Sequence, residues 1–191
     1  MAIYTRKGDT GSTSHVQHGR LSKGSIEIEV SGKFDSAITM MGFAGEALKD
    51  QARQDTRHMS DYEVLLESLV YAQRKLFTAA VCTFSETGCN NPLAQKDVDD
   101  LESRIDFYSE KLPALTGFVL PGGCEANARL NLARTSVRDL ERSMVKAKDG
   151  YNLEDTNDSV LRYLNRLSDA LYTYARYALL LDGHDEINWG A

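Results

Sequence analysis

The chain has 191 residues, of which 42% are hydrophobic and 26% are charged, and its formal net charge is −6. This length suggests one domain with room for a substantial core, and the composition is that of an ordinary globular protein. The negative charge argues against broad nucleic-acid binding, which needs a basic face. No run of about 18 apolar residues is present, so we expect neither nucleic acid nor a membrane as a partner.

Cysteine usage and the polar N-terminus bear on the compartment. The cysteines Cys82, Cys89 and Cys124 are odd in number and lack metal-ligand spacing, so free thiols in a reducing compartment are the simplest expectation. The first residues are too polar for a signal peptide. We expect a cytoplasmic protein, and the sequence identifies no metal ligands.

The N-terminal residues 1–25 are rich in Gly, Ser, Thr and His and lack hydrophobic periodicity. We expect a loop there, followed by a helical domain over 26–191, with a single domain overall. Apolar residues then recur at roughly helical spacing up to about residue 52, at Ile28, Phe34, Ile38 and Met41. The alternation of apolar residues over 26–30 leaves a short strand open as an alternative start.

The next two segments predict helices that end at turn-forming residues. Over 59–86 the apolar face comprises Tyr62, Leu65, Leu69, Leu76 and Ala80, and the helix stops at Gly88 and Asn90-Asn91-Pro92. Over 95–111 the inward face comprises Val98, Leu101, Ile105, Tyr108 and Leu112, and Pro113 ends the helix.

The last two predicted helices carry the most regular apolar stripes. Over 124–148 the stripe is Ala126, Leu130, Ala133, Val137, Leu140 and Met144, and over 157–181 it is Val160, Leu164, Leu167, Leu171, Tyr174 and Ala178. Alternating steps of four and three residues favour helices packed nearly antiparallel. No strand alternates with these helices, so we predict an all-α, up-and-down-like five-helix bundle rather than a doubly wound α/β fold.

Helix 124–148 carries a row of arginines, Arg134, Arg138 and Arg142, at successive helical turns. Like charges at this spacing repel by roughly 0.2–0.5 kcal/mol per pair, so carboxylates, solvent or a bound anion must compensate them. Arg134 and Arg138 adjoin the apolar stripe and so lie at a helix–helix seam, where an arginine fork suits a carboxylate or a phosphate. Structural salt bridges and an anion site both stay open.

Two further polar groupings allow two interpretations each. Asn165 and Asp169 lie one turn apart beside the last apolar stripe, where they either bond between helices or order an arginine or a ligand hydroxyl. The run Thr5-Arg6-Lys7-Gly8-Asp9-Thr10-Gly11-Ser12-Thr13 combines glycines, hydroxyls and cations that suit a phosphate. It lacks Walker A spacing and a preceding strand, so a flexible tail is the alternative.

Three segments together resemble the PduO-type ATP:cob(I)alamin adenosyltransferase (corrinoid adenosyltransferase) family. The first is Tyr4 to Thr13, followed by Ser22-Lys23, Gly32 and Asp35; the second is Phe118-Val119-Leu120-Pro121-Gly122-Gly123, with Ala133-Arg134-Thr135, Arg138, Glu141 and Arg142; the third is Tyr163-Leu164-Asn165-Arg166-Leu167-Ser168-Asp169, with Ala175-Arg176-Tyr177. Their order and spacing are similar to the family along nearly the whole chain.

The resemblance implies a five-helix bundle that assembles as a homotrimer with its sites between adjacent subunits. It also implies transfer of the 5′-deoxyadenosyl group of ATP to the cobalt of a reduced corrinoid, cob(I)alamin, giving adenosylcobalamin and triphosphate. ATP and a corrinoid are then the substrates, and Mg²⁺ accompanies the ATP.

The resemblance also implies roles for particular residues. The loop from Thr5 to Thr13 and Lys23 wrap ATP, and Arg138 contacts the triphosphate from the neighbouring subunit. Glu141, Arg142 and Asn165 lie near the nucleotide. Asp35 pairs with Arg134 across the interface, and Phe118 faces the lower side of the corrinoid, where it excludes the lower axial ligand.

Four positions depart from the family's pattern. Ser36 and Ile38 replace the Glu and the Asn of a usual Asp-Glu-Leu-Asn run, Asn131 replaces a usual His, and Asp139 replaces the second arginine of a usual Arg-Arg pair. Asp139 reverses the charge beside Arg138, and it either orders that arginine or weakens anion binding. A non-catalytic relative that binds ATP or a corrinoid is therefore the alternative function.

Overall fold

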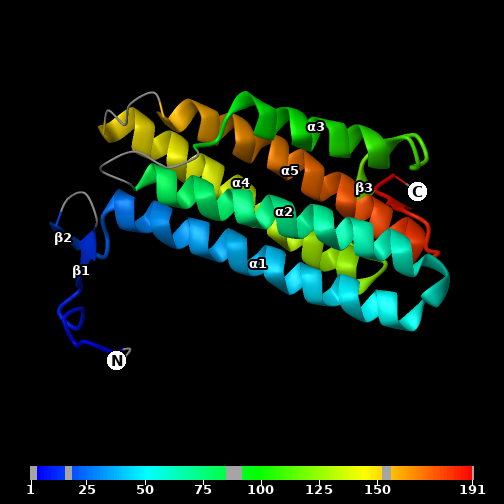
Figure 1. Cartoon of the computed structure of the whole chain (residues 1–191), viewed down its shortest axis with the longest axis horizontal. Helices are drawn as coiled ribbons and strands as arrows, with labels where there is room; N and C mark the ends of the chain where they lie inside the picture. The colour runs from blue at the N-terminus through cyan, green and yellow to red at the C-terminus, as the bar shows by residue number, and fades with distance from the viewer. Residues whose placement is uncertain (1–3, 16–18, 85–91, 152–155, 191) are drawn as a thin grey trace.

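The structure is a computed structural model that describes residues 4–15, 19–84, 92–151 and 156–190. Within these residues five α-helices account for most of the chain: α1 (Ile26–Gln54), α2 (Met59–Thr83), α3 (Gln95–Ser109), α4 (Glu125–Tyr151) and α5 (Thr156–Leu181). A single 3₁₀ turn, η1 (Thr56–His58), joins α1 to α2. The predicted all-α bundle is confirmed (Figure 1).

The four long helices form a closed ring in cross-section. α1 packs on α2 and α4, and α5 packs on α2 and α4. The shorter α3 lies outside this ring, mainly against α5 (Figure 1). α4 and α5 therefore share one long seam, which is the seam beside the arginine row.

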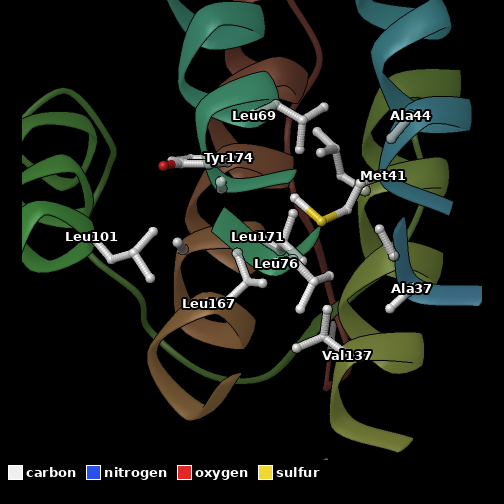
Figure 2. Close-up of a cluster of buried hydrophobic side chains, with 14 of the residues drawn as sticks. Ala37, Met41, Ala44, Leu69, Leu76, Leu101, Val137, Leu167, Leu171 and Tyr174 are labelled. Carbon is white, nitrogen blue, oxygen red and sulfur yellow. The ribbon is translucent and has the colours of Figure 1, made fainter. Parts of the chain in front are cut away.

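The core is built from the predicted stripes. All six stripe residues of α4 and all six of α5 are buried. Figure 2 shows small residues of α1, Ala37 and Ala44, beside Met41, facing larger residues of α2 such as Leu69 and Leu76. Small residues let α1 approach its neighbours closely. Burial of each leucine stabilises the fold by roughly 1.5–3 kcal/mol. Because the apolar stripe of α4 faces this core, the remaining face of α4 is available to line the cavity.

The start of α1 settles the alternative at residues 26–30 in favour of a helix. Ser25 has the extended backbone of an N-cap residue, with φ −76° and ψ 156°, and Glu27 and Glu29 lie in the first turn. Acidic residues there are stabilised by the helix dipole. The alternative of a short strand is therefore excluded, and the burial of Val30 and Phe34 on one face follows the helical period.

The expected N-terminal loop contains a small hairpin that the sequence did not predict. β1 (Ser12–His15) pairs antiparallel with β2 (Gly19–Ser22), with Ser12 opposite Ser22. None of the strand residues is buried, so no apolar alternation marks them. Backbone pairing and a hydrogen bond from Arg20 to the Lys7 carbonyl (2.6 Å) hold the segment instead.

A second pair of short strands lies at the other end of the bundle. β3 (Val119–Leu120) pairs with β4 (Ile187–Asn188), so that the C-terminal segment lies beside the chain that leads into α4 (Figure 1). Gly183, with φ +75°, ends α5 as predicted and turns the chain toward β4.

Other boundaries and the cysteines differ in part from expectation. α2 ends at Thr83 and α3 at Ser109, slightly before the predicted ends, while Gly88 and the first two residues of the Asn90-Asn91-Pro92 turn lie outside the described residues. Cys124 is free, but Cys82 is disulfide-bonded, so the free-thiol prediction is wrong for Cys82. No described helix combines the length and apolar character needed to cross a membrane.

The glycine pair before α4 yields a stability prediction. Gly123 has φ +91°, and a Cβ placed there would lie 2.6 Å from Cδ1 of the buried Leu179, whereas Gly122 has φ +137° and open space around it. Each alanine substitution meets backbone strain of about 1–3 kcal/mol, and Gly123→Ala adds overpacking of about 1–3 kcal/mol. In urea unfolding, Gly123→Ala should therefore lose more free energy of unfolding than Gly122→Ala. Equal losses would show that the Leu179 side chain moves away without cost.

Candidate functional site

A cavity of about 730 Å³ opens between α4, α5 and the segment that precedes α4. This volume lies in the range of small-molecule sites. Its walls combine the α3–β3 connection with polar residues of the helix seam: Leu115, Thr116, Gly117, Phe118, Val119, Leu120, Pro121, Asn127, Asn131, Arg134, Arg138, Ser168, Asp169, Tyr172, Arg176, Leu179 and Glu186. Two of the predicted arginines and the predicted aromatic residue thus share one cavity.

A chain of amides along α4 holds the cavity's inner wall. The Oδ1 atom of Asn127 accepts from the Gly122 amide (2.8 Å), and its Nδ2 atom donates to the Ala175 carbonyl of α5 (2.9 Å). Asn131 Nδ2 donates to Asn127 Oδ1 (3.1 Å), and Asn131 Oδ1 accepts from Nε of Arg134 (3.0 Å). Asn131, which departs from the family's pattern, therefore orients Arg134.

Arg138 lies near the middle of α4 and is exposed toward the cavity. It makes no hydrogen bond or ion pair with the described residues. Arg134 likewise has no carboxylate partner among them, and lies over the ring of Tyr172 with its guanidinium 5.9 Å from the ring centroid. The two acidic wall residues have other partners: Asp169 is paired with Arg166 at 3.0 Å, and Glu186 is paired with Arg176. The cavity therefore carries positive charge that a bound anion would neutralise.

Asp139 does not contact Arg138. Its carboxylate accepts hydrogen bonds from Nζ of Lys33 on α1 and from Nη2 of Arg142 (3.0 Å), on the neighbouring face of α4. The row predicted from the sequence is thus divided: Arg142 is in a salt bridge, and Arg138 has no partner among the described residues. The salt-bridge interpretation is confirmed for Arg142, and the anion site at Arg138 stays a prediction.

The Lys33–Asp139 pair predicts a pH-dependent contribution to stability. The hydrogen bond from Lys33 lowers the pKa of Asp139 below its usual 3.8, and the same bond raises the pKa of Lys33 above 10.5. The aspartate therefore stabilises the fold above about pH 3.8, and this contribution is lost as the pH falls through its lower folded pKa. The lysine's contribution is lost only as the pH rises past 10.5 through its higher folded pKa.

We accordingly expect Asp139→Asn to lower the Tm slightly at pH 7, because a partly exposed pair contributes little. The difference from the unsubstituted chain should shrink as the pH falls toward 3. Asp106→Asn, at an exposed position of α3 with no ion pair among the described residues, is the matched control. A Tm difference that stays constant between pH 7 and pH 3 would contradict the assignment.

Phe118 lies at the mouth of the cavity with 85% of its surface exposed. Its carbonyl accepts a hydrogen bond from the Trp189 amide (2.8 Å), next to the β3–β4 pairing. Leu115, Leu120, Ile187 and Trp189 are exposed in the same two segments. An apolar rim of this kind beside a charged wall is typical of a ligand site. Nothing in the sequence singled out Trp189 of the rim or Glu186 of the wall.

The N-terminal loop forms its own cluster away from the cavity. The Lys23 amide donates to the Gly11 carbonyl (2.9 Å), and a Cβ at Gly8 would lie 3.2 Å from Nζ of Lys23. The predicted proximity of Lys23 to the loop is therefore present. Arg20, which the sequence did not single out, also contacts the loop through Ser12 Oγ. None of the residues from Thr5 to Thr13 lines the cavity, and the hairpin lies at the opposite end of the bundle from β3 (Figure 1).

Asp35 lies in a different groove from Arg134. This groove of about 400 Å³ runs between α1 and α2 and is lined by Ser31, Phe34, Asp35, Ile38, Phe77, Ala80, Val81 and Phe84. The exposed Asp35 makes no ion pair with the described residues. The predicted Asp35–Arg134 pair is therefore not formed within one chain.

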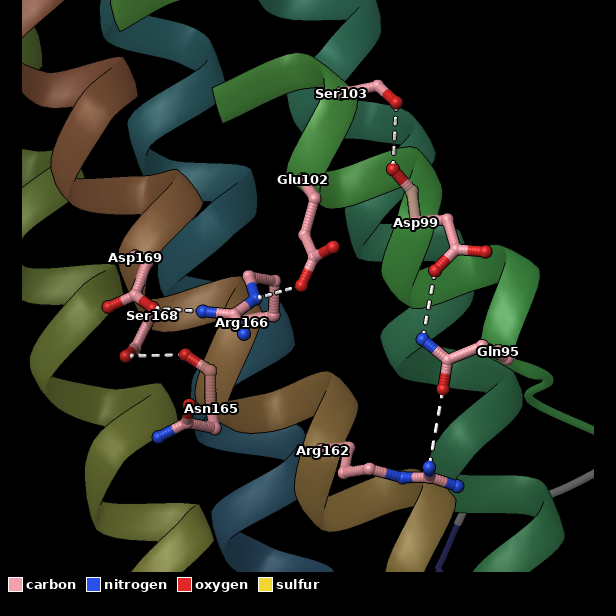
Figure 3. A network of polar contacts seen from close by, with 9 residues as sticks. All are labelled: Gln95, Asp99, Glu102, Ser103, Arg162, Asn165, Arg166, Ser168 and Asp169. Carbon is pink, nitrogen blue, oxygen red and sulfur yellow. Dashed lines mark hydrogen bonds and ion pairs between the residues drawn. The ribbon is translucent and has the colours of Figure 1, made fainter. Parts of the chain in front are cut away.

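The polar strip of α5 divides between two neighbouring helices. Asn165 donates to Glu141 of α4 (3.2 Å), which brings these two predicted site residues together. Figure 3 shows the other side of the strip, where Arg166 bridges Glu102 of α3 (2.9 Å) and Asp169, and Arg162 donates to Gln95. Inter-helix bonding thus explains the two arginines, while Asn165 faces the α4 seam.

The fold and the cavity define a class of protein: a helical bundle with an arginine-bearing, apolar-rimmed cavity at one helix seam. The chain belongs to the cobalamin adenosyltransferase family, because the sequence model of that family matches residues 3–178. The family resemblance inferred from the three sequence motifs is confirmed.

Relatives of known identity agree with this assignment. The chain is 33% identical to the corrinoid adenosyltransferase of Bacillus subtilis (strain 168), covering 99% of this chain and 92% of the relative. It is also 33% identical to the corrinoid adenosyltransferase PduO of Salmonella typhimurium, covering 92% of this chain but only 49% of the relative, so it spans about half of that protein.

A solved structure shows what this fold holds in a relative. A variant PduO-type ATP:corrinoid adenosyltransferase from Lactobacillus reuteri, complexed with cobalamin and ATP, superposes with a TM-score of 0.85 at 27% identity, over 100% of both chains. That relative binds both ligands on the same fold.

Proposed function

We propose that this chain transfers the 5′-deoxyadenosyl group of ATP to the cobalt of cob(I)alamin, giving adenosylcobalamin and triphosphate. The observation that carries the proposal is the presence, in one cavity, of the uncompensated Arg138 and the exposed Phe118. The leaving group of ATP is a polyanion, and a corrinoid presents a broad apolar ring, so this cavity suits both substrates. The relatives' names and the ligands of the related structure support the same activity.

The proposed reaction needs no nucleophile from the protein. Cobalt(I) donates an electron pair to the ribose C5′, the C5′–O bond breaks, and the bonding pair leaves on the triphosphate while cobalt becomes cobalt(III). The protein must align C5′ with cobalt and stabilise the departing charge. The corrinoid carries the difficult chemistry, which fits a sequence without a nucleophile elbow.

The candidate residues divide between the two substrates. We assign the triphosphate to Arg138, with Glu141 and Asn165 beside it, and the lower face of the corrinoid to Phe118. The loop from Thr5 to Thr13, together with Lys23, covers ATP, so residues 1–25 act as a nucleotide-binding loop on the helical domain 26–191. Arg142 contributes through long-range charge, since Asp139 already binds its guanidinium.

Mg²⁺ enters this proposal with the nucleotide. Within the described residues no group of three His, Cys, Asp or Glu could hold a metal ion. Mg²⁺ in nucleotide sites is held by phosphate oxygens with one or two carboxylates, and Glu141 is the carboxylate that α4 offers beside Arg138. The ion would neutralise part of the triphosphate charge. A cytoplasmic location, where ATP is available, completes the proposal.

The separation of the loop from the cavity supports a site built between chains. The hairpin and β3 lie at opposite ends of the bundle, and Asp35 and Arg134 face different grooves. We propose a homotrimer in which Asp35 of one subunit pairs with Arg134 of the next. By light scattering, the single variants Asp35→Arg and Arg134→Asp should have the molar mass of a monomer. The double variant should recover the molar mass of a trimer. A monomeric unsubstituted chain would contradict the assembly.

The activity is tested by incubating the protein with ATP and chemically reduced cobalamin and following the absorbance change of adenosylcobalamin formation. Product above a protein-free control is expected. Nucleotide binding by calorimetry without turnover would instead support a non-catalytic relative, the alternative that Ser36, Ile38, Asn131 and Asp139 raise. Failure to bind either nucleotide or corrinoid would exclude both functions.

A further inference from the structure

The C-terminal segment is tied to the bundle by a shielded ion pair at the edge of the cavity. Arg176 of α5 is bound to Glu186 through Nε, and its Nη2 atom donates to the other carboxylate oxygen at 3.2 Å. The two side chains are only 10% and 18% exposed. Two parallel bonds from a guanidinium to a carboxylate form a directional, well-defined contact.

The same guanidinium also binds the segment that carries Phe118. Nη2 of Arg176 donates to the Pro113 carbonyl at 2.7 Å, just where the chain leaves α3. Five residues later the Phe118 carbonyl accepts from the Trp189 amide, three residues beyond Glu186. Arg176 therefore anchors the segment from Pro113 to Phe118 directly at its start and, through Glu186 and β4, indirectly at its end.

The Phe118 side chain has little packing of its own to hold it. It is 85% exposed, so its position depends on the backbone that carries it. That backbone leads directly into a short strand, β3, whose only strand partner among the described residues is β4. A residue that fixes β4 consequently fixes the aromatic ring at the mouth of the cavity.

We propose that Arg176 and Glu186 are positioning residues for Phe118: their ion pair clamps β4 onto β3 and so sets where the ring meets the corrinoid. This inference rests on the proposed function. It separates two roles within one cavity, because Arg138 acts on the triphosphate whereas the Arg176–Glu186 clamp acts on the corrinoid side.

The test compares Glu186→Gln, which keeps the shape and removes the charge, with Glu102→Gln as the matched control. Glu102 also pairs with an α5 arginine, Arg166, which precedes Arg176 by nearly three helical turns (Figure 3). Because Trp189 is the only tryptophan of the chain, its fluorescence anisotropy reports on β4 without any need for turnover. We expect the anisotropy to fall in Glu186→Gln and to stay unchanged in Glu102→Gln.

The second readout is the absorption spectrum of cob(II)alamin bound together with ATP, which distinguishes cobalt with and without a lower axial ligand. Glu186→Gln should reduce the fraction lacking that ligand several-fold, while the affinity for ATP stays within about two-fold. A lower Trp189 anisotropy with an unchanged cobalt(II) spectrum would overturn the proposal. Equal losses of adenosylation rate from cobalt(I) and from cobalt(II) would also overturn it. Absence of adenosylation by the unsubstituted chain would instead overturn the proposed function, and is recognised separately.

Loss of one partner leaves the other shielded and unpaired, which can destabilise a fold by several kcal/mol. Arg176→Met combined with Glu186→Leu guards against this, since apolar replacement of a buried pair is often tolerated. The double variant should fold with the Tm nearly unchanged and still lose the cobalt(II) signature. Retention of that signature in the folded double variant would also overturn the clamp.

Discussion

Arg138→Ala is expected to lower kcat/KM for ATP by roughly 10²- to 10³-fold, the loss typical of removing one preorganised donor to developing negative charge. The physical reason is that Arg138 faces the cavity without any partner among the described residues, so its whole donor capacity is available to the triphosphate. Because it is exposed and unpaired, its removal should leave the Tm nearly unchanged. Steady-state kinetics with cob(I)alamin, together with thermal unfolding, measure both effects.

Two further substitutions make this result specific. Arg138→Lys keeps the charge but loses the planar guanidinium, so its kcat/KM for ATP should lie between those of the unsubstituted chain and the alanine variant. Arg162→Ala removes another exposed arginine, on α5, whose side chain donates to Gln95, and its activity should stay within about two-fold. Equal activities of Arg138→Ala and Arg162→Ala would contradict the assignment of Arg138 to the triphosphate.

Phe118→Ala is expected to act on a different step. A ring that is exposed in the free protein and covered by the corrinoid gains roughly 1.5–3 kcal/mol on burial, which is about 10- to 100-fold in rate. If that energy displaces the lower axial ligand, the reaction started from cobalt(II) should lose this factor, whereas the reaction started from cobalt(I) should lose far less. Parallel assays from the two oxidation states give the ratio.

Phe107→Ala is the control for removal of an exposed phenylalanine. Phe107 lies on α3 and is 46% exposed, away from the cavity, so both assays should be unaffected. The assignment of Phe118 would fail if its alanine variant lost the same factor from cobalt(I) and from cobalt(II), because the ring would then serve binding in general.

The bundle was largely predictable because its stripes are long and regular. Leu130, Val137 and Leu140 recur on one face of α4 over several turns, and such a pattern has few alternatives to a buried helix face. The hairpin and the β3–β4 pair were not predictable. Their strands are two to four residues long, and pairing between residues about 68 positions apart, such as Val119 and Asn188, leaves no local signal.

The site was predictable in its residue types and only partly in its contacts. Motif order pointed to Arg138 and Phe118, and the cavity holds both. Sequence could not decide whether Asp139 orders Arg138, because its actual partner, Lys33, comes from a helix more than a hundred residues earlier. Arg176 lay within a recognised motif, but its role requires knowing that Glu186 and the Pro113 carbonyl converge on it.

The N-terminal hairpin lies at the opposite end of the bundle from β3, which borders the arginine-lined cavity (Figure 1), and this has a consequence for mixed assemblies. In the proposed trimer, a heterologous, head-to-tail contact that closes into a ring would bring unlike ends of neighbouring copies together. A copy lacking Lys23 and a copy lacking Arg138 would each form only defective sites with their own kind. In a mixed assembly, some sites between subunits would carry both defects and others would carry none. Two inactive preparations should therefore regain activity on mixing.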